Sequence, residues 1–311
     1  MYLKLFGKMN NRICVFDACT LINLININDE RLVKRLDYLS FHLSEKVYDE
    51  FRFNVLKRLN FQKDLNLIDG HTYSSRSKYI DILSNRLRTN IIWDSEIKAE
   101  WDKNLFKSLK NHLNYEQMNG EFCSTVLALF LSRFQRNADD KMVWEIKENK
   151  VSFHTDDLPA YEDFMDFFQE NQIGFIEDSV DLILFLYRLD ENFKKKDLRN
   201  NLSELYYQYA IGVSELAKKL KSYDNQNQFQ FRKDRKYKME LNNLIQNLET
   251  LNFYGLKTAA DFFASSPKYN GINQLIKKYS YIQELENSPS NLLIKLKKRL
   301  KRLEVIEHYS I

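Results

Sequence analysis

The chain is poor in the two residues that most often punctuate a fold. Its 311 residues include only 7 glycines and 3 prolines. Turns between many short strands depend on these residues, so their scarcity disfavours an all-β fold and favours helices joined by short connections. This length can hold a full hydrophobic core in one or two domains, and we expect two.

Cysteine and histidine are also scarce. The three cysteines, Cys14, Cys19 and Cys123, form no Cys-x-x-Cys pair, and the five histidines are scattered singly. This pattern argues against a disulfide framework, a zinc site and a His-based hydrolase. We expect the cysteines to be small apolar side chains in a reducing compartment.

Long hydrophobic runs are missing as well. The longest runs, residues 125–131 and 182–187, are far shorter than the ~20 residues that a membrane-spanning helix needs. Residues 1–10 include apolar residues but no continuous apolar run long enough for the core of a signal peptide, and no small-residue cleavage site. We therefore expect a cytoplasmic protein with no membrane partner.

Charge is unevenly spread although the net charge is only +4. Residues 1–189 carry 25 Lys and Arg against 29 Asp and Glu, a net charge of −4. Residues 190–311 carry 22 against 14, a net charge of +8. An acidic front half and a basic rear half suit a carboxylate site that acts on a polyanion; solubility alone is the alternative explanation.

The front half alternates between strand and helix patterns. Short segments that predict strands are residues 13–16, 41–43, 150–154 and 173–176, and residues 91–93 are either a further strand or a buried patch. Segments with helical spacing separate them, and Ser44 is a suitable N-cap for one of these helices. Such alternation is typical of an α/β fold with a three-layer α/β/α arrangement and a parallel sheet. We assign it to residues 1–189.

From residue 190 onwards the strand patterns stop. Leucine and aromatic residues recur at helical spacing, as in Leu198, Leu202 and Leu205. We therefore expect residues 190–311 to form a basic, all-helical C-terminal domain.

Four acids stand at junctions between the predicted elements. Asp17 and Asp156 follow two strands, Glu50 lies on the helix after another strand, and Glu121 opens an apolar helix. In a parallel sheet these side chains would converge on the carboxyl edge, where ligands bind. Carboxylates that converge repel one another unless a cation neutralises them, and a site of oxygen ligands suits Mg²⁺ or Mn²⁺.

The sequence here resembles the PIN-domain ribonuclease family over about residues 12–185. The resemblance rests on Phe16-Asp17-Ala-Cys-Thr20, Val47-Tyr-Asp-Glu50-Phe, Gly120-Glu121 and Thr155-Asp156-Asp157, in that order. It implies that Asp17, Glu50, Glu121 and Asp156 are metal ligands or position the attacking water. It also implies that Thr20 supplies a hydroxyl near Asp17, with Asp157 as a fifth acid.

Several of these residues have a structural alternative. Asp17 alone could be an ordinary strand-to-helix cap, and Thr20 could be an N-cap or a site hydroxyl. Asp49 competes with Glu50, but Glu50 lies closer to the apolar face of its helix, and we favour it.

The resemblance implies a Mg²⁺- or Mn²⁺-dependent endoribonuclease that leaves 5′-phosphate and 3′-hydroxyl ends. An RNA-cutting enzyme in the cytoplasm needs restraint, so a toxin or defence effector held by an inhibitory protein is one expectation. The candidate partners are RNA, such an inhibitor and a second copy of the chain.

Two basic segments in the rear half are candidates for nucleic-acid binding. Residues 295–302 contain six cations among eight residues, beside a stripe of leucines. This pattern is typical of a charged helix face that binds phosphates, and equally of a leucine seam packed on the protein with its lysines in solvent. In residues 229–237 aromatic residues alternate with cations. Surfaces that stack on unpaired bases have this pattern, but a linker between two helices can have it too. The candidate residues are Lys295, Lys297, Lys298, Arg299, Lys301, Arg302, Arg232, Lys233, Arg235 and Lys236.

Two other functions stay open from the sequence. One is a non-catalytic RNA-binding or assembly protein on a PIN-like fold, in which some of the acids would lie away from the sheet edge. The other is a structure-specific DNA nuclease, which usually needs more acids and a helical DNA-gripping insertion.

Overall fold

The computed structural model describes residues 12–137, 143–250, 256–278, 295, 296 and 298–301. The chain divides into two compact units, Met1–Asn201 and Leu202–Ile311. Their boundary lies inside helix α11 (Lys195–Gln226), whereas the boundary expected from the sequence lies between α10 (Ser179–Leu189) and α11.

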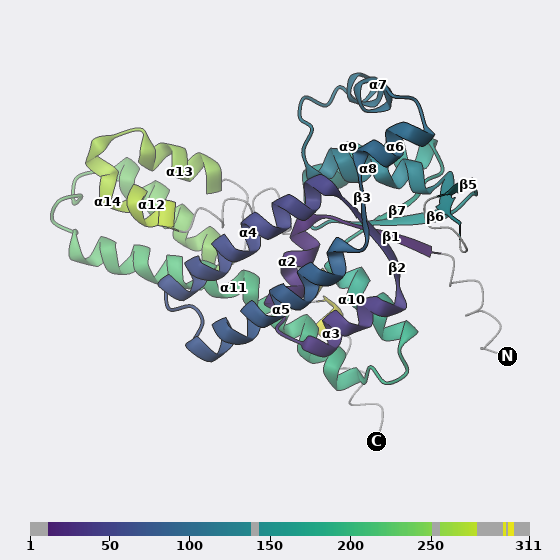
Figure 1. The fold of residues 1–311 in the computed structure, drawn as a ribbon. Helices are drawn as coiled ribbons and strands as arrows, with labels where there is room; N and C mark the ends of the chain where they lie inside the picture. Colours follow the sequence, from purple (N-terminus) through teal and green to yellow (C-terminus); the bar gives the residue numbers. More distant parts are fainter. Residues whose placement is uncertain (1–11, 138–142, 251–255, 279–294, 297, 302–311) are drawn as a thin grey trace. The chain divides into compact units, whose positions relative to one another are not determined.

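A parallel five-stranded sheet forms the centre of the first unit (Figure 1). In the order in which they pair, its strands are β3 (Ile91–Ile92), β2 (Ser40–Ser44), β1 (Arg12–Phe16), β6 (Lys150–His154) and β7 (Gly174–Glu177). The four strands expected from the sequence are confirmed, and of the two alternatives for residues 91–93 the strand is correct. β1 and β6 pair in register up to Phe16 opposite His154, so the residues after these two strands leave the sheet side by side.

Helices cover both faces of this sheet. Helices α8 (Gly120–Leu131) and α9 (Leu158–Glu170) pack against Val15 and Phe153 on one face. The alternate residues Phe16 and His154 are equally buried, as expected for strands covered on both sides. Helix α2 (Ala18–Asn26), which follows β1, contacts α10. The expected α/β class with a helix-flanked parallel sheet is confirmed.

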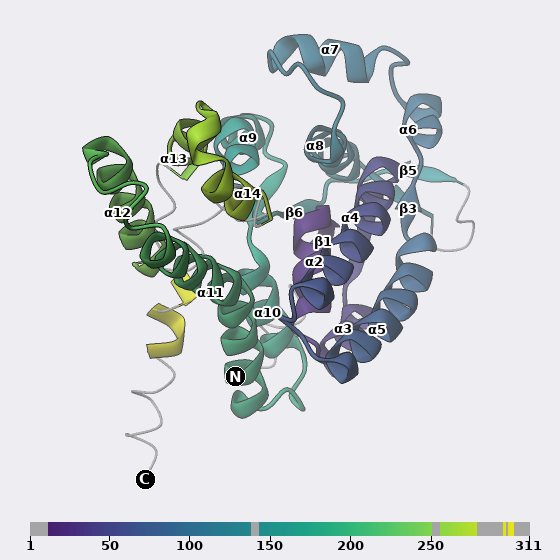
Figure 2. The same ribbon diagram turned by 90° about the vertical axis from the view of Figure 1, so that its left-hand side faces the viewer.

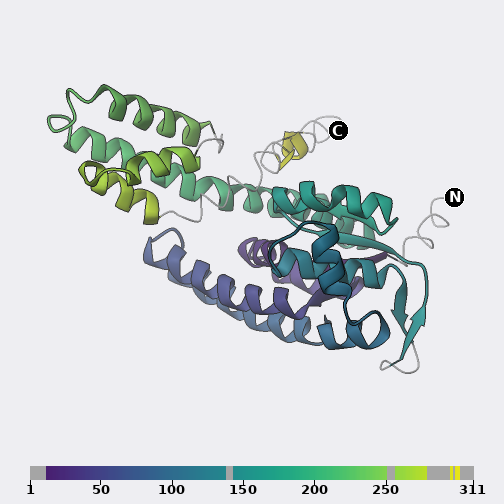
Figure 3. The same cartoon turned by 90° about the horizontal axis from the view of Figure 1, so that it is seen from above.

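The other elements of this unit surround that core. Helices α4 (Glu45–Asp64) and α5 (Gly70–Arg88) lie side by side (Figure 3). Ser44 is the N-cap of α4, and its Oγ accepts from Val47 N at 3.3 Å. The hairpin of β4 and β5 was not expected from the sequence. These elements are α3 (Glu30–Arg35), the 3-10 turn η1 (Leu36–Tyr38), α4 (Glu45–Asp64), α5 (Gly70–Arg88), α6 (Asp94–Glu100), α7 (Leu105–His112), β4 (Phe134–Arg136) and β5 (Trp144–Ile146).

In the described part of the second unit every regular element is a helix. Figure 2 shows α12, α13 and α14 beside α11. An aromatic cluster forms its core, with the rings of Phe231 and Tyr237 stacked 4.1 Å apart. The elements after α11 are α12 (Arg235–Glu249), α13 (Leu256–Ala264), the 3-10 turn η2 (Pro267–Tyr269) and α14 (Asn270–Lys278). Across the described ranges, no helix combines the length and the apolar character that crossing a membrane requires.

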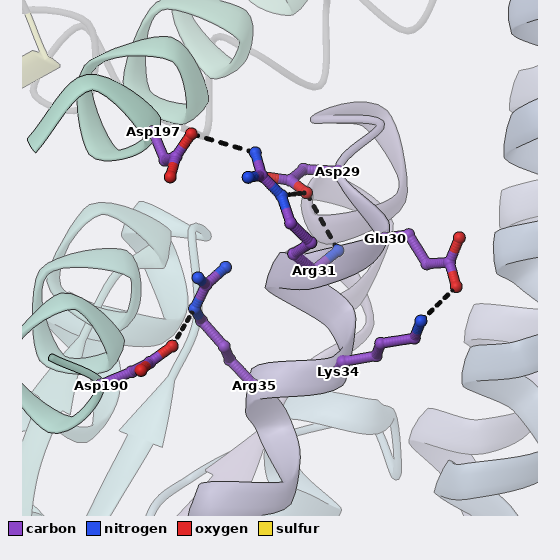
Figure 4. A network of polar contacts seen from close by, with 7 residues as sticks. All are labelled: Asp29, Glu30, Arg31, Lys34, Arg35, Asp190 and Asp197. Atoms are coloured by element: carbon purple, nitrogen blue, oxygen red, sulfur yellow. Dashed lines mark hydrogen bonds and ion pairs between the residues drawn. The ribbon is translucent and has the colours of Figure 1, made fainter. Parts of the chain in front are cut away.

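A buried ion pair joins α3 to the end of α10 (Figure 4). Arg35 Nε donates to Asp190 Oδ2 at 2.6 Å, and the two side chains are only 8% and 7% exposed. The guanidinium also lies 4.1 Å from the ring centroid of Phe193. Burial alone would raise the pKa of Asp190, but hydrogen bonds from Arg35 and from Asn192 N–H lower it.

We expect Arg35→Met to lower the free energy of unfolding by about 3 kcal/mol, because it leaves the Asp190 carboxylate buried without its cation. Urea unfolding measures the loss. Lys34→Met is the matched control, since Lys34 forms an exposed pair with Glu30 on the same helix (Figure 4) and should cost less than about 0.5 kcal/mol. Equal losses in the two variants would contradict a structural role for the buried pair.

Candidate functional site

The candidate site lies where β1 and β6 end, at the carboxyl edge of the sheet. Asp17 follows β1, and its N–H donates to His154 O at 3.0 Å, which continues the pairing of the two strands by one residue. Thr155 follows β6 and therefore lies beside Asp17. Helix α8 contacts both β1 and β6, and Glu121 in its first turn lies close enough to Asp17 for its charge to raise the pKa of Asp17.

Asp17 is almost completely buried, at 5% exposure. It caps α2 through a hydrogen bond of 2.6 Å from Ala18 N to its Oδ1. Thr155 Oγ1 and Cys19 Sγ both donate to its Oδ2, at 2.9 and 3.0 Å. Burial raises the pKa of Asp17 to about 6, the hydrogen bond from Cys19 offsets part of this rise, and the charge of Glu121 adds to it. The capping alternative for Asp17 is thus correct, and it does not remove the residue from the acidic group.

Asp157 and Glu121 face each other across this edge. A hydrogen bond joins their side chains, and burial together with that bond raises the pKa of Asp157 to about 8. Burial and the neighbouring acids therefore favour the protonated form of Asp157 over the charged form. Its Oδ1 is buried and has no hydrogen-bond partner among the described residues. On the other side, Glu121 Oε2 accepts from Tyr115 Oη at 2.7 Å and from Asn119 Nδ2 at 3.2 Å.

Glu50 reaches the same group from α4. Its Oε1 accepts from Gly120 N at 3.0 Å, and a Cβ at position 120 would collide with the same carboxylate. Burial raises the pKa of Glu50, and the nearby charge of Glu121 contributes to the rise. The competing residue, Asp49, is exposed. The structure therefore brings Asp17, Glu50, Glu121 and Asp157 into one electrostatically coupled group.

Asp156 and Thr20 point elsewhere. The Asp156 carboxylate accepts from Ser179 N at 2.8 Å, from the Ser179 hydroxyl and from Asn23 Nδ2 at 2.6 Å. It therefore ties the start of α10 to α2. Thr20 Oγ1 donates to His154 O at 3.1 Å, so its hydroxyl contacts a backbone carbonyl, and Asp17, not Thr20, is the N-cap of α2.

The structure adds polar residues that the sequence did not single out. Thr155 binds Asp17 and also accepts from Asp157 N at 3.1 Å. Cys19 binds Asp17 and accepts from Asp156 N at 3.1 Å, and burial with two nearby carboxylates raises its pKa well above the ordinary value. Thr155 and Cys19 lie within the acidic motifs and could have been found there. Tyr115 precedes α8 in a loop, and no pattern marks it.

The donor chemistry of this group fits a hard divalent cation. All four side chains are carboxyl groups, and the unpartnered Oδ1 of Asp157 is a free oxygen ligand. Within the part of the chain that the structure describes, however, no three His, Cys, Asp or Glu side chains already form a metal-binding arrangement. The raised pKa of Asp157 reflects the repulsion between these acids that a cation would neutralise.

The candidate nucleic-acid-binding residues belong to the second unit. The four candidates at the start of α12 and just before it, Arg232, Lys233, Arg235 and Lys236, are all exposed. Of the later group, Lys298 and Lys301 are exposed and Lys295 and Arg299 are half-buried. Lys297 and Arg302 lie outside the described residues. Phe231 and Tyr237 are core residues at 1% and 0% exposure, so Phe229, at 91%, is the aromatic residue of the 229–237 segment that a base could reach.

Comparison with protein-family models, with curated proteins and with solved structures gives no match to this chain, so the case for its function rests on these residues.

Proposed function

We propose that this protein is a metal-dependent endoribonuclease whose active centre is the group Asp17, Glu121, Asp157 and Glu50. The observation that carries the proposal is the convergence of these acids at the carboxyl edge of a parallel sheet, with the pKa values of Asp17, Asp157 and Glu50 raised. Buried like charges destabilise a fold, so a cluster of this kind indicates a functional site.

The resemblance to PIN-domain ribonucleases forms part of this proposal. The motifs around Asp17, Glu50, Glu121 and Thr155-Asp156-Asp157 supply acids in the order typical of that family, and the edge where they meet supports it. In this proposal Asp157 takes the role that the sequence first gave to Asp156, because Asp157 faces Glu121 while Asp156 binds Ser179.

Each residue has a definite task in this chemistry. Asp17, Glu121 and Asp157, with Glu50 beside them, would hold Mg²⁺ or Mn²⁺, and the ion would supply a bound water of lowered pKa and a positive charge near the phosphate. Thr155 and Cys19 fix the Asp17 carboxylate through its Oδ2. Tyr115 and Asn119 hold Glu121. The expected products carry 5′-phosphate and 3′-hydroxyl ends.

The exposed cations of the second unit suit a polyanionic substrate. Arg232, Lys233 and Arg235 form no ion pair with any described residue, so their charges are free to meet phosphates. RNA is the proposed substrate. We also propose that an inhibitory protein restrains the enzyme, as in a toxin or defence effector. A cytoplasmic location and a second copy of the chain as partner are further parts of this proposal.

A second candidate is a non-catalytic RNA-binding protein on the same fold. The observation that favours it is the lack, among the described residues, of a preassembled group of three metal ligands. In that case no metal ion would bind, and the hydrogen bond between Asp157 and Glu121 would only stabilise the fold or help to bind RNA.

One assay separates these functions. Purified protein is incubated with total cellular RNA and with plasmid DNA, in Mg²⁺, in Mn²⁺ or in EDTA. We expect RNA to be cut in either metal and to stay intact in EDTA. Cutting of DNA in preference to RNA would favour the DNA nuclease, and binding of RNA without any metal-dependent cutting would favour the non-catalytic protein.

A further inference from the structure

One exposed face of α4 carries an aromatic residue between two cations. Lys46, Glu50, Phe53 and Lys57 are spaced by four, three and four residues, so they follow one another along one side of the helix. The buried stripe of α4 lies on another side of the helix and consists of Val47, Phe51, Val55, Leu59 and Gln62.

Phe53 is unusually exposed for a large apolar side chain. Its exposure is 70%, and Lys57 Nζ lies 5.8 Å from the centroid of its ring. A phenylalanine in this position leaves a flat apolar surface in water, where it can gain free energy by stacking on another ring. The neighbouring ammonium group would be attracted to a phosphate beside that ring.

This face leads directly into the acidic group. Glu50, one turn before Phe53, binds Gly120 N and senses the charge of Glu121. Lys46, one turn earlier, lies close enough to Glu50 to lower its pKa in part. At a rise of 1.5 Å per residue, the line from Lys46 to Lys57 is about 16 Å long, enough to follow several nucleotides of a strand.

We propose that α4 positions the substrate strand: Phe53 stacks on an unpaired base next to the cleaved phosphodiester, and Lys46 and Lys57 contact the flanking phosphates. This inference rests on the proposed ribonuclease function and specifies its substrate as single-stranded RNA. Duplex RNA keeps its bases stacked on one another, so it cannot offer a base face to Phe53. Alternating aromatic and cationic groups are also how proteins bind single strands without reading their sequence.

The experiment measures binding apart from cleavage. Fluorescence polarisation in EDTA follows a labelled polyuridine RNA, single-stranded or annealed to polyadenosine. We expect Phe53→Ala to weaken binding of the single strand roughly tenfold, Phe53→Trp to preserve it, and the weak binding of the duplex to stay unchanged. In Mg²⁺, Phe53→Ala should raise KM more than it lowers kcat.

Tyr38→Ala is the matched control. Tyr38 is an aromatic residue of similar exposure, 61%, but it precedes β2 and therefore lies at the opposite edge of the sheet from the acids. Its loss should not change RNA binding. Both variants replace exposed side chains, so thermal unfolding by circular dichroism should match that of the wild type.

Two results would overturn the inference: unchanged single-strand binding by Phe53→Ala, or equal weakening of single-strand and duplex binding. Loss of affinity in Tyr38→Ala of the same size would also overturn it. Failure of the proposed function has a different signature, because an absence of metal-dependent cutting together with Phe53-dependent binding in EDTA would leave the stacking site in place and remove the nuclease.

Discussion

Asp17→Asn is expected to reduce RNA cleavage by about 10³-fold or more, since it removes a charged oxygen ligand from the centre of the proposed site. The fold should survive. Asparagine keeps an oxygen that can accept from Ala18 N. Its amide group would replace Oδ2 and face Thr155 and Cys19, whose hydroxyl and thiol can rotate to accept a hydrogen bond. We expect the free energy of unfolding to change by no more than about 1 kcal/mol. Cleavage assays and urea unfolding measure the two effects.

Asp69→Asn provides the matched control for this prediction. Asp69 caps α5 through Thr72 N at 2.7 Å, as Asp17 caps α2, but it is exposed and does not belong to the acidic group. This variant should keep full activity. A purified Asp17→Asn protein that still cuts RNA in a metal-dependent way would remove Asp17 from the catalytic centre.

The strands of the sheet were predictable because each contains at least two closely spaced apolar residues. β1 is buried on both faces and contains the continuous apolar run Ile13–Phe16. β6 is also buried on both faces, but Ser152 and His154 interrupt its apolar residues. The hairpin of β4 and β5 was not predicted. Phe134, Gln135 and Arg136 in β4 are half-buried, and β5 ends in the exposed Ile146, so neither strand shows a core pattern.

The acidic edge was predictable from the sequence, but the orientation of each carboxylate was not. Asp156 and Asp157 are neighbours at the end of β6, and successive residues of an extended chain point in opposite directions. Asp156 therefore turns towards Ser179 of α10, and Asp157 turns towards Glu121 of α8. Which of the two faces the other acids depends on which helix covers which face of the sheet, and two adjacent identical residues do not encode this.

The aromatic residues of the second unit show a similar limit. Phe229 and Phe231 lie in one short segment, yet their exposures are 91% and 1%. Phe231 stacks on Tyr237, which in turn lies 5.6 Å from the ring of Tyr269. Interleaved aromatic residues and cations describe both a base-stacking surface and a packed core with a charged rim, and only tertiary contacts distinguish the two.

Asp157→Asn is expected to stabilise the metal-free protein and to abolish its activity. The pKa of Asp157 rises from 3.8 to about 8 on folding, so between these values the folded state binds more protons than the unfolded state. The free energy of unfolding of the wild type should therefore fall as the pH rises from about 4 to about 8. Asparagine does not titrate, so it avoids this pH-dependent destabilisation. We expect the free energy of unfolding of the variant to be higher than that of the wild type by on the order of 2 kcal/mol at pH 8. Its rate of RNA cleavage should fall by about 10²-fold or more. Urea unfolding across this pH range, in EDTA, measures the gain.

The neighbouring residue supplies the control for this prediction. Both oxygens of Asp156 accept hydrogen bonds, one from Ser179 N and the other from Asn23 Nδ2. In Asp156→Asn an amide NH2 group replaces one of these oxygens and faces another donor. This change should lower the free energy of unfolding by about 1–3 kcal/mol. Added Mg²⁺ should stabilise the wild type and the Asp156→Asn protein, but not Asp157→Asn, because only Asp157 contributes an oxygen to the proposed site. If Asp157→Asn destabilised the protein and Asp156→Asn abolished both activity and stabilisation by Mg²⁺, the two aspartates would exchange roles, and the catalytic group would be the one first expected from the sequence.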